Sequence, residues 1–136
     1  MSFNRRLGAC WLALAAVSSS NSLAVASDAA FPFDRELMLE AAPLRGSKRI
    51  PIIEIAESGA ASIRLWCTSA RAQANVGAGS ISIVPGEIQS AQCGAERQSS
   101  DDNLLAALAQ VTNWRRQGDV IELSGTRTLR FRLMTN

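Results

Sequence analysis

The chain has 136 residues, which fits one domain, and 47% of them are hydrophobic, as in a folded globule. It contains no histidine, so the commonest general base and the commonest metal ligand of proteins are missing. The formal net charge is +2, and two of the basic residues, Arg5 and Arg6, lie in a segment that we expect to be removed. Without that pair, 12 of the 14 basic residues remain and balance the 12 acidic ones, which argues against a nucleic-acid-binding protein or a polybasic membrane-surface protein.

The first 26 residues have the three-part layout of a secretory signal peptide. A basic start (residues 1–6) leads into an apolar run (7–17) and then a small, polar stretch (18–26), so we predict cleavage between Ala26 and Ser27. The apolar run would span about 16 Å as a helix, which is roughly half of a bilayer core. A stable transmembrane span in the mature chain is therefore not expected, and an uncleaved anchor is the alternative outcome.

The chain has three cysteines, and the first of them, Cys10, raises a second alternative. Residues 7–10 (Leu-Gly-Ala-Cys) have the residue types of a lipoprotein cleavage box, but they precede the main apolar run rather than follow it. If the signal peptide is removed, Cys67 and Cys93 remain, and two cysteines in an exported chain predict a disulfide. A redox pair would need closer spacing, and a zinc site would need more ligands than a histidine-free chain offers.

Short alternating stretches predict strands in the first half of the mature chain. Residues 27–33 are expected to form a flexible lead-in, and residues 34–44 favour either a strand or a short helix that Pro43 ends. The predicted strands are residues 50–55, 62–67, 80–84 and, more weakly, 87–93, with turns at 46–48, 58–59, 77–79 and 85–86.

An amphipathic helix is predicted after the polar stretch that begins at Gln98. Ser99 or Ser100 can cap its start, and Asp101 and Asp102 then lie in the first turn, where negative charge suits the helix dipole. A cation-binding role for the two aspartates is the less favoured alternative. One apolar stripe should face the core, formed by Leu104, Leu105, Leu108 and Val111.

A hairpin and a closing strand are predicted at the C-terminal end. Residues 113–117 and 120–123 flank a Gly118-Asp119 turn, which is typical of a hairpin. A further turn at 124–126 leads into the last strand. Its inward residues are Leu129, Phe131 and Leu133, and its outward residues are Thr128, Arg130 and Arg132.

This C-terminal unit resembles the META domain, the family of the heat-shock protein HslJ. The similarity is best over residues 102–111 (DNLLAALAQV), where family members carry a comparable helix. It continues through Trp114, Gly118-Asp119, Ile121, Leu123 and the closing Leu129-x-Phe131. The family often has Gly-Cys-Asn and Thr-Arg-Met-x-Cys stretches upstream; Cys67 and Cys93 match the cysteines, whereas the flanking residues differ, as in a divergent member.

The resemblance implies an α+β, β-rich fold: a small antiparallel sheet or partly open barrel with one packed helix. A single domain would occupy residues 27–136 behind the signal peptide, with the best resemblance at 67–133. Family members are often exported or envelope-associated and are loosely linked to stress tolerance. No catalytic residues are generally agreed for the family, so none is carried over to this chain.

Four residues are candidates for a binding surface. Alternation along the strand predicted at 62–67 turns Trp66 away from the inward face, and burial under the helix or the N-terminal segment is the alternative. Arg130 and Arg132, with Arg115 on a neighbouring strand, would offer a cationic patch to an anionic partner. The simpler interpretation is a solvated strand face on which these arginines pair with Glu122.

The sequence therefore predicts a monomeric, non-catalytic envelope protein, periplasmic or secreted, with a binding or stress-tolerance role. No cofactor, catalytic residue or metal site is predicted, and the expected partner is an envelope protein or ligand rather than nucleic acid. The alternative is a small secreted inhibitor of a protease or lysozyme, because such inhibitors are also small, disulfide-linked and β-rich. An enzyme is the least favoured interpretation, since no nucleophile–base arrangement is visible.

Overall fold

A computed structural model describes residues 30–89 and 91–135 of the chain. The predicted signal peptide, its cleavage site after Ala26 and the alternative lipoprotein box at Cys10 all lie outside the described residues.

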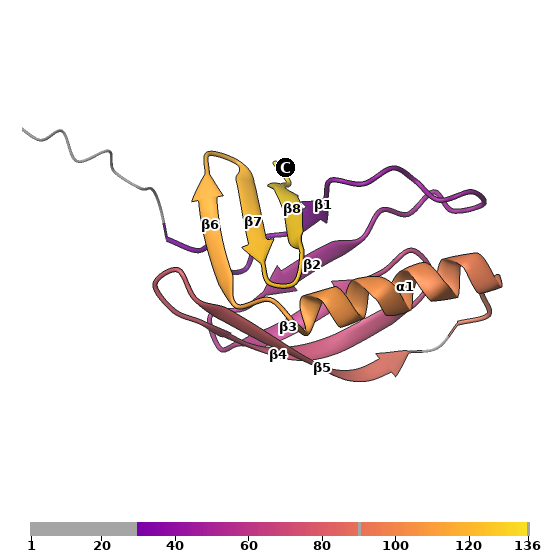
Figure 1. The fold of residues 1–136 in the computed structure, drawn as a ribbon, viewed down its shortest axis with the longest axis horizontal. Helices are drawn as coiled ribbons and strands as arrows, with labels where there is room; N and C mark the ends of the chain where they lie inside the picture. The colour runs from indigo at the N-terminus through magenta and orange to yellow at the C-terminus, as the bar shows by residue number, and fades with distance from the viewer. Residues whose placement is uncertain (1–29, 90, 136) are drawn as a thin grey trace, which may run out of the picture.

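One antiparallel sheet of eight strands forms the body of the protein, and a single helix packs on it (Figure 1). The strand order is β5-β4-β3-β2-β1-β8-β7-β6, so the sheet combines two meanders joined through β1 and β8. This architecture confirms the expected β-rich α+β fold. The elements are β1 (Leu37–Leu39), β2 (Ile52–Ile55), β3 (Ala60–Arg64), β4 (Ser69–Val76), β5 (Ile81–Gln89), α1 (Ala95–Leu108), β6 (Asn113–Gln117), β7 (Val120–Ser124) and β8 (Thr128–Leu133).

The sheet curls until its two edge strands meet at one end, which makes it a half-barrel. Ser80, just before β5, forms an isolated antiparallel bridge with Asn113 of β6. The Ile81 N–H donates to the Thr112 carbonyl at 3.0 Å, and the Trp114 N–H donates to the Gly79 carbonyl at 3.1 Å. Beyond this junction β5 and β6 diverge, and α1 crosses the face formed by β3, β4 and β5 (Figure 1).

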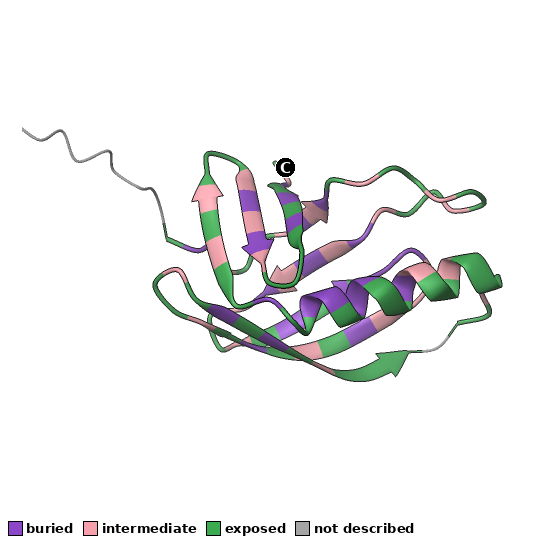
Figure 2. Ribbon diagram, viewed as in Figure 1, coloured by how far each residue is buried: buried purple, intermediate pink, exposed green. Residues whose placement is uncertain are grey.

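Alternating burial along the strands shows why the sequence forms this sheet (Figure 2). In β8 every second residue is buried, and Phe131 at its centre is fully enclosed. The predicted helical stripe is confirmed for Leu104, Leu105 and Leu108, which are buried; Val111 is buried as well but lies beyond the end of α1. The core therefore lies between the concave side of the sheet and one face of α1, and burying these apolar surfaces is the main stabilising term.

The helix begins earlier than predicted, at Ala95, with Gly94 as its N-cap residue and no side-chain cap. Ser99 and Ser100 therefore do not cap it, and neither aspartate lies in its first turn; that position belongs to Glu96. The prediction was wrong because the polar residues 95–100 form a helical extension beyond the core-facing stripe. Cys93 anchors this extension through its disulfide with Cys67.

The predicted turn at Pro85-Gly86 is also wrong, because both residues lie inside β5. The register with β4 shifts there: Ala72 pairs with Pro85, whereas Ala70 pairs with Ile88. One extra residue in β5 produces a β-bulge, a setting that tolerates both proline and glycine on an edge strand. The later strand predicted at 87–93 is thus the end of β5, which stops at Gln89.

The segment that precedes β1 was predicted to be a flexible lead-in, but the part of it that the structure describes packs against the core. Phe31 is 5% exposed, and its ring lies 5.3 Å from that of Trp114 in an edge-on arrangement. Pro32 is buried as well. The Arg116 guanidinium donates to the Ala30 carbonyl at 3.3 Å, so this segment is fastened along β6. Two aromatic residues in a short N-terminal stretch are the sequence signal for this packing.

Candidate functional site

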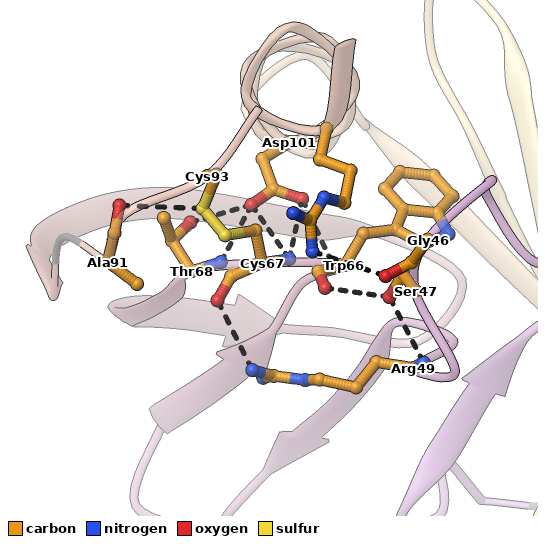
Figure 3. Close-up of a disulfide and its surroundings, with 10 residues drawn as sticks. Gly46, Ser47, Arg49, Trp66, Cys67, Thr68, Ala91, Cys93 and Asp101 are labelled. Carbon is orange, nitrogen blue, oxygen red and sulfur yellow. Dashed lines mark hydrogen bonds between the residues drawn. A yellow bond between two sulfur atoms is a disulfide. The ribbon is translucent and has the colours of Figure 1, made fainter. Parts of the chain in front are cut away.

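A buried carboxylate joins the helix to the turn between β3 and β4 (Figure 3). Asp101 is 1% exposed, and its side chain points from the middle of α1 into that turn. It accepts hydrogen bonds from the backbone N–H groups of Trp66 at 2.9 Å, Cys67 at 3.2 Å and Thr68 at 2.8 Å. The Thr68 hydroxyl donates a further bond at 2.9 Å. We call this arrangement, together with Cys93, the Asp101 junction.

Charge and geometry explain why a carboxylate is retained at this position. The turn presents several donors that no strand partner uses, and an ionised carboxylate offers about four acceptor sites. Charge-assisted bonds of this kind are roughly twice as strong as neutral ones, which offsets the cost of burying the charge. Asp101 is therefore a positioning residue for the turn, not the helix-start charge or cation ligand that the sequence suggested.

The predicted disulfide lies at the same junction. The structure bonds Cys67 to Cys93, with their Cα atoms 6.1 Å apart, which is within the usual range. Cys93 immediately precedes the N-cap residue of α1. Asp101 and the disulfide consequently fasten two successive parts of the helical segment to one turn of the sheet.

Trp66 lies in the core rather than on the outer face. It is 9% exposed, and its carbonyl accepts a bond from the Ser47 hydroxyl at 3.1 Å. Of the two orientations left open by the sequence, burial is the one observed, because β3 ends at Arg64 and strand alternation no longer applies at Trp66. The indole Nε1 is buried and has no hydrogen-bond partner among the described residues.

The three arginines of the candidate binding surface lie together on the outer face of the sheet, away from Trp66. Arg115 and Arg130 stand directly opposite Glu122 in the register of β6, β7 and β8. The Arg115 Nε atom lies 2.5 Å from Glu122 Oε2. Arg130 and Arg132 share the carboxylate of Glu40, at 3.2 and 2.7 Å. We call these five residues the outer charge ladder; it carries three positive and two negative charges.

Pairing within the ladder changes the proton affinity of its central carboxylate. The hydrogen bond from Arg115 holds the pKa of Glu122 below its ordinary value; partial desolvation opposes this, and the nearby charges of Arg115 and Arg130 add to it. In return, Glu122 raises the pKa of the Arg115 guanidinium. The ladder is thus a mixed, ionised array, which agrees with the simpler interpretation of a strand face paired with Glu122 and not with a purely cationic patch.

Neither a metal-binding cluster nor a membrane-spanning helix is found within residues 30–89 and 91–135. No group of three or more acidic or cysteine side chains is placed to hold a metal ion there. In the same part of the chain, no helix has the length and apolar character needed to cross a membrane.

Asp101 was assigned to the helix start from the sequence, and its role in holding the turn was missed, although a signal was present. It stands three, four and seven residues before Leu104, Leu105 and Leu108, so it falls on the same apolar stripe. A carboxylate on a core-facing stripe predicts a buried partner, and a turn rich in free N–H groups supplies it.

Comparison with known proteins shows which solved structures and which family this chain is similar to. No curated protein gives a significant sequence match. A protein from Burkholderia xenovorans solved by NMR has a similar structure, with a TM-score of 0.58 and 18% identity over 76% of this chain and 84% of that one. A second NMR structure has a TM-score of 0.55 and 15% identity, over 73% of this chain and 88% of that one. The META domain family model matches residues 35–135, nearly the whole described part, and the chain therefore belongs to the META domain family.

Proposed function

We propose that this protein is an exported, non-catalytic META-domain protein of the bacterial cell envelope that acts by binding a partner there. The observation that carries the proposal is the Cys67–Cys93 disulfide at the Asp101 junction. Disulfides of this structural kind persist in oxidising compartments such as the periplasm and are rare in the cytosol. The signal-peptide layout of residues 1–26 supports the same location.

A binding role agrees with what the chain offers chemically. Histidine is missing from the sequence, and the META family is not a known enzyme family. The outer charge ladder instead presents three arginines with side chains 53–68% exposed. Arginine forms bidentate pairs with carboxylates, so an acidic partner surface could take over the bonds now made to Glu40 and Glu122. We propose that the protein acts as a monomer through this face, in a stress-tolerance role.

A capture experiment tests the partner. The oxidised, tagged protein is incubated with periplasmic extract, beside an Arg130→Ser/Arg132→Ser variant and an Arg127→Ser control. Arg127 is exposed in the β7–β8 turn, outside the ladder. The proposal predicts a partner that the wild type and the control retain and the double variant loses. Repeated capture of no partner, with no envelope-stress phenotype on gene deletion, would contradict it.

A secreted inhibitor is the second candidate, favoured by the long connection between β1 and β2. This segment extends beside the N-terminal end of the helix (Figure 1), and most of residues 40–49 are exposed. Its turn at residues 45–47 is held by the Ser47–Trp66 bond and by Arg97, which donates to the Gly46 carbonyl at 3.5 Å. Inhibitor loops gain affinity from such preorganisation. Lack of inhibition across a panel of proteases and lysozymes at micromolar concentration would remove this candidate.

A further inference from the structure

A shallow hollow lies on the outer face of the sheet where β1, β2 and β3 run side by side. Its volume is about 270 Å³, and it does not include any residue of the outer charge ladder. We call it the Met38 hollow; its lining residues are Met38, Lys48, Arg49, Ile50, Ile52 and Arg64.

The register of the sheet builds an apolar floor for this hollow. Met38 stands directly opposite Ile52, and Ile52 stands opposite Arg64. Their neighbours along the strands, among them Ile53 and Ile63, are buried, so these three side chains face away from the core. Met38, Ile50 and Ile52 are half-buried, which leaves apolar surface open at the bottom of the hollow.

The rim of the hollow is cationic. Arg64 is paired with Glu36, and Arg49 donates one N–H to the Cys67 carbonyl at 3.2 Å. Lys48 forms no ion pair with any residue in the described part of the chain. The Arg64–Glu36 pair has no net charge. Lys48 and Arg49 therefore give the rim of the hollow a net positive charge beside its apolar floor.

Two other hollows on the same sheet show why this one is distinct. The hollow over β3 and β4 measures about 360 Å³ and includes Glu54, and the hollow over β6 and β7 includes Glu122. A carboxylate in the wall repels a bound anion, whereas the lining of the Met38 hollow contains none.

We propose that the Met38 hollow binds a medium-chain aliphatic carboxylate. The chain lies on Met38, Ile50 and Ile52, and the carboxylate lies between Lys48 and Arg49. A volume just below the usual range of about 300–1,000 Å³ for ligand pockets leaves room for one short chain. A singly charged head suits this rim, because Glu36 already occupies Arg64 and one Arg49 donor is engaged.

The test is a titration of the purified, oxidised protein, labelled with ¹⁵N, with sodium octanoate. The amide signals of Met38, residues 48–50, Ile52 and Arg64 should shift together, with a dissociation constant on the order of 1 mM or below. Acetate, which lacks the chain, and octanol, which lacks the charge, should each bind at least about fivefold more weakly, since each makes only part of the contacts.

Variants separate the two halves of the site. Lys48→Gln/Arg49→Gln should weaken octanoate about tenfold and leave octanol unchanged, whereas Ile52→Ser should weaken both ligands. Arg127→Gln, on the distant β7–β8 turn, is the matched control and should change neither. A well-dispersed spectrum of each variant shows that the fold is kept.

Three results would overturn the assignment: shifts that fall outside the hollow or are lacking altogether, equal binding of octanol and octanoate, or octyl phosphate binding more than tenfold tighter than octanoate. The inference goes beyond the proposed function, because it concerns another part of the outer face, lined by residues outside the ladder, and is measured on purified protein. Its failure would leave the proposals of export and of partner binding at the ladder untouched.

Discussion

Asp101 is a charged side chain inside the core, and the turn between β3 and β4 supplies the donors that hold it there. Its carboxylate accepts bonds from three consecutive backbone N–H groups, those of Trp66, Cys67 and Thr68. Removing such an acceptor leaves buried donors unsatisfied, which costs more than the bonds themselves contribute. The neighbouring Asp102 is exposed and makes a natural comparison.

Asp101→Asn should therefore destabilise the protein by about 2–3 kcal/mol, because the new amide group turns a donor towards N–H donors. Urea unfolding at neutral pH measures the change in the free energy of unfolding. Asp102→Asn is the control and should change that free energy by less than about 0.5 kcal/mol. Equal losses in the two variants would mean that the Asp101 bonds do not hold the turn.

Glu122 gives the outer charge ladder a pH dependence whose sign follows from its lowered pKa. Because the folded-state pKa lies below the unfolded value, the ionised carboxylate stabilises the fold above about pH 4.3. That contribution is lost as the pH falls through the lowered folded-state pKa. The wild type should thus lose melting temperature over this acidic range more steeply than Glu122→Gln.

Thermal unfolding between pH 7 and pH 3 checks this expectation. The difference in melting temperature between wild type and Glu122→Gln should be largest near neutral pH and shrink towards pH 3. Glu57→Gln, at an exposed position in the β2–β3 turn, is the matched control. A wild-type advantage that grows as the pH falls would contradict a lowered pKa for Glu122 in the folded protein.

The turn between β7 and β8 packs against residues 110–112, which follow the C-terminal end of α1. The Thr126 hydroxyl donates to the Gln110 side chain at 2.6 Å, and the Thr112 N–H donates to the Ser124 carbonyl at 2.9 Å. Gly125 permits this approach: an added Cβ would meet the Gln110 carbonyl group and would lie 2.9 Å from Val111 Cα. Backbone atoms cannot move aside as a flexible side chain can.

Gly125→Ala should consequently cost about 2–3 kcal/mol of stability through overpacking. Gly94→Ala is the control, because nothing lies within 4 Å of its added Cβ, and it should cost less than about 1 kcal/mol. Urea unfolding of the two variants compares them directly. A Gly125→Ala protein as stable as wild type would show that the turn and helix can separate without loss.

Most strands and the helical stripe could be predicted from the sequence because hydrophobic alternation follows burial, whereas β4, which is small and polar, was not predicted as a strand. Leu129, Phe131 and Leu133 show this most clearly. The helix start could not be predicted, because the tertiary anchor at Cys93 replaces the side-chain cap that local rules require. The bulge at Pro85-Gly86 has the same residue types as a turn, and only pairing with β4 separates the two.

The candidate site also has features that could be predicted from the sequence and features that could not. The Cys67–Cys93 pair and the shared face of the ladder arginines follow from residue count and strand period. The role of Asp101 and the burial of Trp66 depend on where β3 ends, which no local pattern fixes.

The disulfide connects distant parts of the molecule, since it closes a separation of 26 residues between the sheet and the helix. In the chain-entropy model, such a loop stabilises by about 3–4 kcal/mol. A Cys67→Ser/Cys93→Ser variant should lose about that much of its free energy of unfolding, as measured with urea. The wild type should lose a similar amount when a reductant is present. A variant as stable as the oxidised wild type would show that the Asp101 junction holds without the bond.

The proposed envelope role depends on export and on oxidation of this one cysteine pair. The most direct measurement is the intact mass of the protein from a periplasmic fraction, alkylated without prior reduction. We predict a chain that starts at Ser27 and carries no alkyl group, which would establish cleavage and the Cys67–Cys93 bond together. A full-length mass with alkylated cysteines would contradict the location, the disulfide and the envelope role built on them.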